Sequence, residues 1–230
     1  MELGTADDRA VAFAEQGALR VRGALDAQAL QQLFDALADH RPNQAGVRLH
    51  GLLALQSFLT PSGPIGRIPA PLMGHRARPV RCILFDKTSS ANWAVPWHQD
   101  RTIVVQGRIE VAGFGPWTRK SGLLHVAPPD DVLARMVTIR VHLDPVPETN
   151  APLLIAPGSH RLGRMPEADV PDVIRRYGTA MCCAEAGDIW IYKTLILHAS
   201  EAASRPAHRR VLQLDYADFD LPAGLRWLGV

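Results

Sequence analysis

The sequence predicts a mainly β fold, a β-sandwich or jelly roll with N-terminal helices packed on one sheet. Helical signals are confined to about residues 1–79, whereas about residues 80–220 break into short β-prone runs separated by turn residues. Helices that come first and strands that follow are typical of a helical layer on one face of a sheet. All-β chains of 230 residues usually stay undivided, so we expect a single domain over residues 1–230.

The composition is that of an ordinary globular protein and narrows the choice of partners. Hydrophobic residues make up 47% of the chain, and the formal net charge is +2. This balance gives no reason to expect nucleic acid or an anionic membrane as a partner, and no apolar run is long enough to span a bilayer. Three cysteines cannot all pair, so we expect reduced thiols and a cytoplasmic location. The oligomeric state is left open.

Two helices and a strand are expected before residue 40. Residues 5–16 predict a short helix with Thr5 as its candidate cap. Residues 17–25 predict a strand that leads to Asp26, a candidate cap for the next helix. In that second helix, four apolar side chains recur at helical spacing and should face a core. They are Leu30, Leu33, Phe34 and Leu37.

A loop and then a series of strands should follow. Residues 61–79 are rich in proline and glycine and predict a loop with one short helix. The β-prone runs are residues 81–85, 101–105, 136–143, 152–156, 188–192 and 210–216. In one of them the polar residues Thr138, Arg140, His142 and Asp144 alternate with aliphatic ones. The polar face would look into a barrel with room for one small ligand, although alternation fits a solvent-facing side equally well.

The segment Trp97-His98-Gln99-Asp100 contains a possible metal site. On a strand, positions i and i+2 share a face, so His98 and Asp100 can reach one ion. A neutral imidazole and a carboxylate are two of the three ligands in the facial triad of non-haem Fe(II) oxygenases. By itself this short pattern is weak, because exposed polar pairs on strands are common.

A second segment supplies the third ligand and a carboxylate anchor. His198 follows a strand-like run, and Arg209 begins the next strand 11 residues later. The planar guanidinium group of arginine pairs bidentately with a carboxylate, as a 2-oxoglutarate site requires. Strand parity selects Arg209 over Arg210, because Arg210 shares its face with Leu212, Leu214 and Tyr216 and should pack on the helices.

These segments together resemble the phytanoyl-CoA dioxygenase (PhyH-like) family of double-stranded β-helix oxygenases. The resemblance is carried by residues 85–100, 150–163 and 187–210, in the order of that family's motifs. It implies an enzyme that uses Fe(II), 2-oxoglutarate and O2, with iron held by His98, Asp100 and His198. Three motifs in order are far more specific than one.

The resemblance also implies positions for the cosubstrate. Its distal carboxylate would bind Arg209 and Ser200, and Gln99, Ile83 and Lys87 would lie beside it. Arg140 stands where many relatives carry tryptophan, before a turn that is Asn150-Ala151 here. Whether Arg140 and Lys87 contact 2-oxoglutarate or substrate is left open.

The implied reaction is oxidation of a small molecule. Decarboxylation of 2-oxoglutarate yields succinate, CO2 and an oxidant that abstracts hydrogen from a C–H bond. Related halogenases carry a small residue in place of Asp100, so hydroxylation is expected here; desaturation, ring closure and epimerisation stay open, as does the identity of the substrate. The alternatives are a cupin-like metal-binding protein or hydrolase with Zn(II) in the same triad, and a non-catalytic family member.

Residues outside the triad are less well determined. Between Asp100 and Val137 we expect a long loop that closes over the site as a lid, with Trp117 and His125 near the substrate. Trp93 is a further candidate for the pocket wall. The segment Pro157–His160 is interpreted as structural, a turn whose serine and histidine satisfy backbone groups.

Overall fold

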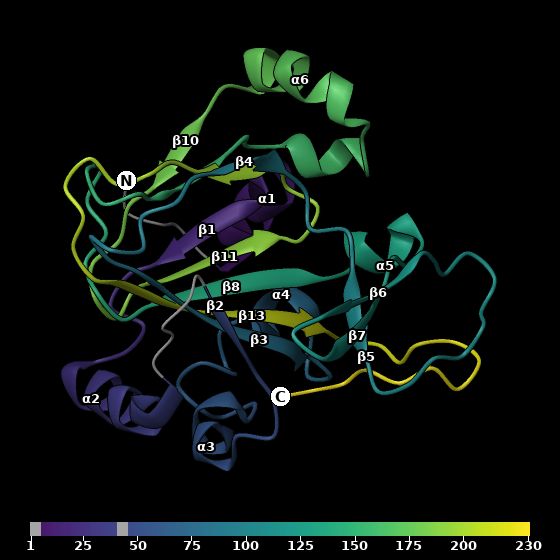
Figure 1. Cartoon of the computed structure of the whole chain (residues 1–230), viewed down its shortest axis with the longest axis horizontal. Helices are drawn as coiled ribbons and strands as arrows, with labels where there is room; N and C mark the ends of the chain where they lie inside the picture. The colour runs from purple at the N-terminus through teal and green to yellow at the C-terminus, as the bar shows by residue number, and fades with distance from the viewer. Residues whose placement is uncertain (1–5, 41–45) are drawn as a thin grey trace.

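The computed structural model describes residues 6–40 and 46–230, which form three antiparallel sheets with helices around them (Figure 1). The largest sheet has six strands in the order β1 (Ala18–Val21), β11 (Ile189–Lys193), β8 (Val137–His142), β13 (Arg209–Ala217), β3 (Arg78–Lys87) and β2 (Gly46–Leu49). The second has four, β10 (Ala180–Cys182), β9 (Leu153–Ile155), β12 (His198–Ser200) and β4 (Val95–His98). The predicted mainly β fold is confirmed.

The helices lie mostly before the strands, as predicted. They are α1 (Ala6–Gln16), α2 (Ala27–Ala36), α3 (Gln56–Leu59), α4 (Ala70–Met73), α5 (Asp130–Ala134) and α6 (Val170–Tyr177), with short 3-10 turns at Ala38–His40, Leu53–Leu55, Ser159–Leu162 and Glu167–Asp169. In the described ranges, the longest helix has 11 residues, and no helix is both long and apolar enough to cross a bilayer. The candidate cap Thr5 lies outside the described residues.

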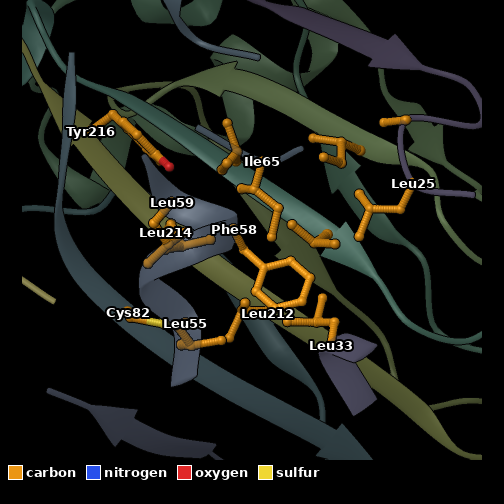
Figure 2. Close-up of a cluster of buried hydrophobic side chains, with 14 of the residues drawn as sticks. Leu25, Leu33, Leu55, Phe58, Leu59, Ile65, Cys82, Leu212, Leu214 and Tyr216 are labelled. Atoms are coloured by element: carbon orange, nitrogen blue, oxygen red, sulfur yellow. The ribbon is translucent and has the colours of Figure 1, made fainter. Parts of the chain in front are cut away.

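One face of the six-stranded sheet packs against the N-terminal helices. Asp26 caps α2 by accepting a hydrogen bond from the backbone N–H of Ala29 at 2.8 Å, as predicted. Leu33 and Leu37 of this helix are buried, and Leu30 and Phe34 pack against the same cluster. Figure 2 shows Leu33, Leu55 and Phe58 converging on side chains of the sheet.

The opposite face of this sheet is polar, and strand parity determines it. In β8, Ile139 and Val141 are in the helical core, whereas Thr138 and Arg140 point to the other side. β13 obeys the same rule, since Leu212 and Leu214 are in the core and Gln213 contacts Arg140. Asp144 departs from the predicted pattern. It lies beyond the end of β8 and forms an ion pair with Arg210 at 2.6 Å, on the helical side.

The segment predicted to be a long loop contains regular structure, whereas its role as a lid stays a prediction. β6 (Trp117–Lys120) and β7 (Leu123–Val126) form a hairpin that pairs with β5 (Ile103–Val105) in a third sheet. The turn at Ser121-Gly122 has positive φ at both residues, 49° and 79°, which suits a tight two-residue hairpin.

Candidate functional site

A cavity of about 480 Å³ is lined by residues from both larger sheets. From β3 it receives alternate side chains, because every second residue of a strand faces the same way. These are Arg81, Ile83, Phe85 and Lys87. Arg140, Arg209 and Gln213 come from β8 and β13, whereas His98, His198 and Ser200 come from the four-stranded sheet.

Three potential metal ligands meet in this cavity. One ligand atom each from His98, Asp100 and His198 lies within 4.8 Å of the others. His98 ends β4 and is paired directly with His198 of β12, so that the two imidazole ring centroids are 4.2 Å apart. Asp100 follows two residues later, just beyond the strand.

Backbone carbonyls orient both imidazoles. Nδ1 of His98 lies 2.8 Å from the carbonyl oxygen of Pro96, and Nδ1 of His198 lies 2.9 Å from that of Ile196. If each Nδ1 donates its proton to the carbonyl, each Nε2 keeps a free lone pair for a metal. Burial lowers the pKa of His198 to about 4, and the neighbouring His98 acts in the same direction. A neutral imidazole is the form that binds metal.

A residue that the sequence interpretation missed supports Asp100. Arg81 donates from Nη2 to Oδ2 of Asp100 at 3.1 Å and pairs through Nε with Asp215 at 2.5 Å. Asp215 in turn accepts a hydrogen bond from Thr138 at 3.0 Å. Burial would raise the pKa of Asp100, but Arg81 and the two histidines outweigh it and hold that pKa below its usual value. The alternation Arg81, Ile83, Phe85, Lys87 in β3 was the available signal for Arg81.

Deeper in the cavity lies a group of cations, defined here as the inner cations Lys87, Arg140 and Arg209. All three are buried, and in the described part of the chain none of them forms an ion pair. Lys87 donates to Ser200 Oγ at 2.8 Å and to two backbone carbonyls, and Arg140 donates to Gln213 at 2.7 Å. Arg209 donates to the carbonyl of Ala151 at 2.5 Å, and its Nε is buried without a partner.

Mutual repulsion adds to the effect of burial on these charges. Burial, together with the positive charges of Arg209 and Arg140, lowers the pKa of Lys87 to about 7. Burial and Arg140 likewise lower the pKa of Arg209 to about 9. An anion bound among these groups would offset the repulsion and raise the pKa values of Lys87 and Arg209, since an opposite charge favours the charged form.

The two adjacent arginines are separated as parity predicts. Arg209 is 3% exposed and lines the cavity. Arg210 forms its ion pair with Asp144 and lies over the ring of Phe34, 4.4 Å from the centroid, on the helical side of the sheet. Only Arg209 is therefore placed to meet a ligand.

Other candidate residues are placed differently from what the sequence suggested. The amide of Gln99 contacts three backbone groups, so it braces the chain around residues 163–165 and 195 although the residue borders the cavity. Trp117 packs against the core cluster of the third sheet and does not line the cavity. His125 is fully buried beside Thr102, which itself lines the cavity.

Two further expectations agree with the geometry. Trp93 lines the cavity, and the ammonium of Lys87 lies 4.9 Å from its ring centroid. In the segment Pro157–His160, Ser159 accepts a hydrogen bond from the backbone N–H of Leu197, and His160 contacts the carbonyl of Ala14. The segment is thus structural, as predicted.

Comparisons with known proteins agree with this geometry. The family model for phytanoyl-CoA dioxygenase (PhyH) matches residues 13–211. A search of curated proteins finds no match. Among solved structures, EctD from S. alaskensis in its apoform superposes with a TM-score of 0.67 at 17% identity, over 91% of this chain and 75% of EctD.

Two similar structures come from nogalamycin biosynthesis. The non-heme alpha ketoglutarate dependent epimerase SnoN superposes with a TM-score of 0.66 at 19% identity, over 97% of this chain and 86% of SnoN. For the carbocyclase SnoK the TM-score is 0.67 at 17% identity, over 96% of this chain and 88% of SnoK. At such identities the likeness establishes the fold, and the match of the family model to most of the chain establishes the family. The chain belongs to the phytanoyl-CoA dioxygenase family of Fe(II)- and 2-oxoglutarate-dependent oxygenases.

Proposed function

We propose that this protein hydroxylates an unactivated C–H bond of a small molecule in a reaction that consumes 2-oxoglutarate and O2 and releases succinate and CO2. One observation carries the proposal. A two-histidine, one-carboxylate cluster and the unpaired inner cations lie in the same cavity. Neither group of residues alone would indicate this chemistry.

The chemistry of the donor set fits Fe(II). His98, Asp100 and His198 would hold the ion through two imidazole nitrogens and one carboxylate oxygen, a set that leaves further coordination positions open. The carbonyls of Pro96 and Ile196 hold the rings in the required tautomer, and Arg81 holds the carboxylate. Bound iron and 2-oxoglutarate would supply the oxidising chemistry.

The inner cations fit a dicarboxylate. Arg209 would pair with the distal carboxylate of 2-oxoglutarate, because its guanidinium group is buried and cationic and has no ion-pair partner within residues 6–40 and 46–230. Ser200 would add its hydroxyl, which Lys87 holds in place at 2.8 Å. Arg140, fixed by Gln213, would add positive charge on the same side.

The remaining walls would shape the substrate site. Trp93, Trp97, Val95 and Leu153 line the cavity and would exclude water from the reacting C–H bond. The similar structures include an epimerase and a carbocyclase, so only product analysis separates hydroxylation from those outcomes. We place the reaction in a single oxygenase domain in the cytoplasm, in keeping with three free cysteines.

A metal-exchange assay tests the part of the proposal that all these outcomes share, the iron-dependent turnover of 2-oxoglutarate. Metal-free protein should form succinate from 2-oxoglutarate after addition of Fe(II), and not after addition of Zn(II) or of no metal. Succinate formation should also stop when O2 is removed. Hydrolysis supported by Zn(II), or binding of metal and 2-oxoglutarate without any succinate formation, would contradict the proposal.

A further inference from the structure

The charge of the cavity lining exceeds what iron and 2-oxoglutarate require. Seven lysine or arginine residues line the cavity, against two acidic residues, Asp100 and Glu167. Arg81 is paired with Asp100 and Asp215, and the inner cations match the dianionic 2-oxoglutarate of the proposed function. Arg101 is bound to the carbonyl of Met165. Two cations, Arg48 and Lys120, are left over.

These two cations come from different sheets and meet at one side of the cavity. Arg48 is on β2, and its Nη1 donates to Oγ of Ser121 at 3.0 Å. Ser121 directly follows Lys120 at the end of β6. Both Arg48 and Lys120 line the cavity, and in the part of the chain that the structure describes neither has an acidic partner.

The surroundings of Arg48 are those of an incomplete binding site. Its Nε is buried and has no hydrogen-bond partner among the residues that the structure describes. Burial lowers the pKa of Arg48, and the nearby charge of Arg81 lowers it further. The same positive charges act on the buried His125. Burial, together with the charges of Arg81, Lys120 and Arg48, lowers its pKa to about 4. Unpaired buried donors carry a cost that a bound acceptor would remove.

We propose that Arg48 and Lys120 bind an anionic group of the substrate, a carboxylate or a phosphate, and so determine which small molecules are oxidised. This inference rests on the proposed function, since it assigns the inner cations to 2-oxoglutarate. A cavity of about 480 Å³ must hold 2-oxoglutarate and the reacting part of the substrate, which favours a small anion.

Thermal unfolding of the Fe(II)- and 2-oxoglutarate-loaded protein without O2 tests the inference. Acetate and inorganic phosphate are the probes, with sodium chloride at matched ionic strength as the reference. We expect one of these anions to raise Tm beyond the effect of chloride, and the responding anion tells carboxylate from phosphate. The apparent dissociation constant of that anion should increase roughly 10- to 100-fold in Lys120→Gln and in Arg48→Gln.

Arg119→Gln is the matched control. Arg119 is on the same strand as Lys120 but donates to the carbonyl of Gly122 and does not line the cavity. This variant should respond to the anion as the wild type does. Because Lys120 is exposed, Lys120→Gln should fold even if Arg48→Gln does not.

Failure of this inference and failure of the proposed function give different results. Protein that is not stabilised by Fe(II) with 2-oxoglutarate would contradict the proposed function. Protein that is stabilised by them but responds to neither anion, or that responds equally in Lys120→Gln and Arg119→Gln, would overturn the inference.

Discussion

At the scale of single residues, the proposed cosubstrate site depends on which of two adjacent arginines faces the cavity. Arg209→Ala should weaken 2-oxoglutarate binding by about 2–5 kcal/mol, because it removes a charge-assisted pair in a shielded site. Arg210→Ala should leave that affinity nearly unchanged and lower stability instead, since it breaks the ion pair with Asp144. Anaerobic titration of the iron-loaded variants with 2-oxoglutarate measures the difference. Equal losses of affinity would mean that parity does not select the anchor.

Arg81 provides a second test at the metal centre. Arg81→Met should lower Fe(II) affinity about 10- to 100-fold, the usual effect of removing a group that orients a metal ligand. Equilibrium dialysis with Fe(II) measures this without any turnover. Arg81→Lys should recover part of the affinity. Arg78→Met is the control, because Arg78 is on the same strand but pairs with the exposed Asp220. An unchanged iron affinity in Arg81→Met would show that Asp100 needs no such support.

The positions of some of these side chains could be predicted from the sequence, whereas the contacts of others could not. The positions of Arg209 and Arg210 could be predicted because alternation along a regular strand fixes which face each side chain takes. Alternation along β3 could also have placed Arg81 on the cavity face. Its role could not be predicted, because that role depends on Asp100 and Asp215, and residues far apart in sequence reveal their contacts only in the fold. The backbone contacts of the Gln99 amide could not be predicted for the same reason, since its partners include residues 163 and 195.

At the scale of elements, the pair Gly187-Asp188 directly precedes β11 and links it to β1 of the six-stranded sheet. We expect this link to make the stability of the protein depend on pH. Asp188 accepts backbone hydrogen bonds from Gly23 and Glu185 and pairs with Arg20 of β1. A Cβ on Gly187 would lie 2.4 Å from the carbonyl of Leu25, and its φ is +86°. This motif is therefore structural, with no room for substitution at the glycine.

Asp188→Asn should lower the free energy of unfolding by about 2–3 kcal/mol near neutral pH. Burial would raise the pKa of Asp188, but the two N–H groups and Arg20 lower it below its usual value. A lowered folded-state pKa contributes stability above the unfolded value of about 4, and this contribution is lost as the pH falls through the folded value. Urea unfolding at neutral pH and at about pH 3 should show a difference that shrinks in acid. A pH-independent difference would contradict this.

The third sheet shows where sequence reasoning about elements fails. β6 and β7 have four residues each, too short for a clear alternating pattern. Their stability comes from packing, since Trp117, Leu124 and Val126 bury against the cluster around Ile103 and Leu133. The long helix and strand patterns elsewhere were recognisable because each carried its own periodicity.

At the scale of the whole molecule, the six-stranded sheet separates two environments. Figure 1 shows α2 and α3 on one side of this sheet and β4 and β10 of the four-stranded sheet on the other. The face toward the helices is apolar, whereas the opposite face carries Arg81, Arg140, Arg209, Lys87 and the cavity. The separation follows from period-2 alternation along β3, β8 and β13. It explains why the fold class and the cavity-facing side of β8 and β13 could be predicted together, while the shape of the cavity could not.

The central claim is that His98, Asp100 and His198 hold the iron that drives 2-oxoglutarate turnover. The most direct test measures iron content and O2-dependent succinate formation in parallel for the wild type, His198→Ala and His75→Ala. His75 is exposed and lies outside the cavity, which makes it the control. We predict that the wild type and His75→Ala bind iron and form succinate, whereas folded His198→Ala does neither. Stoichiometric iron and wild-type succinate formation in His198→Ala would contradict the account.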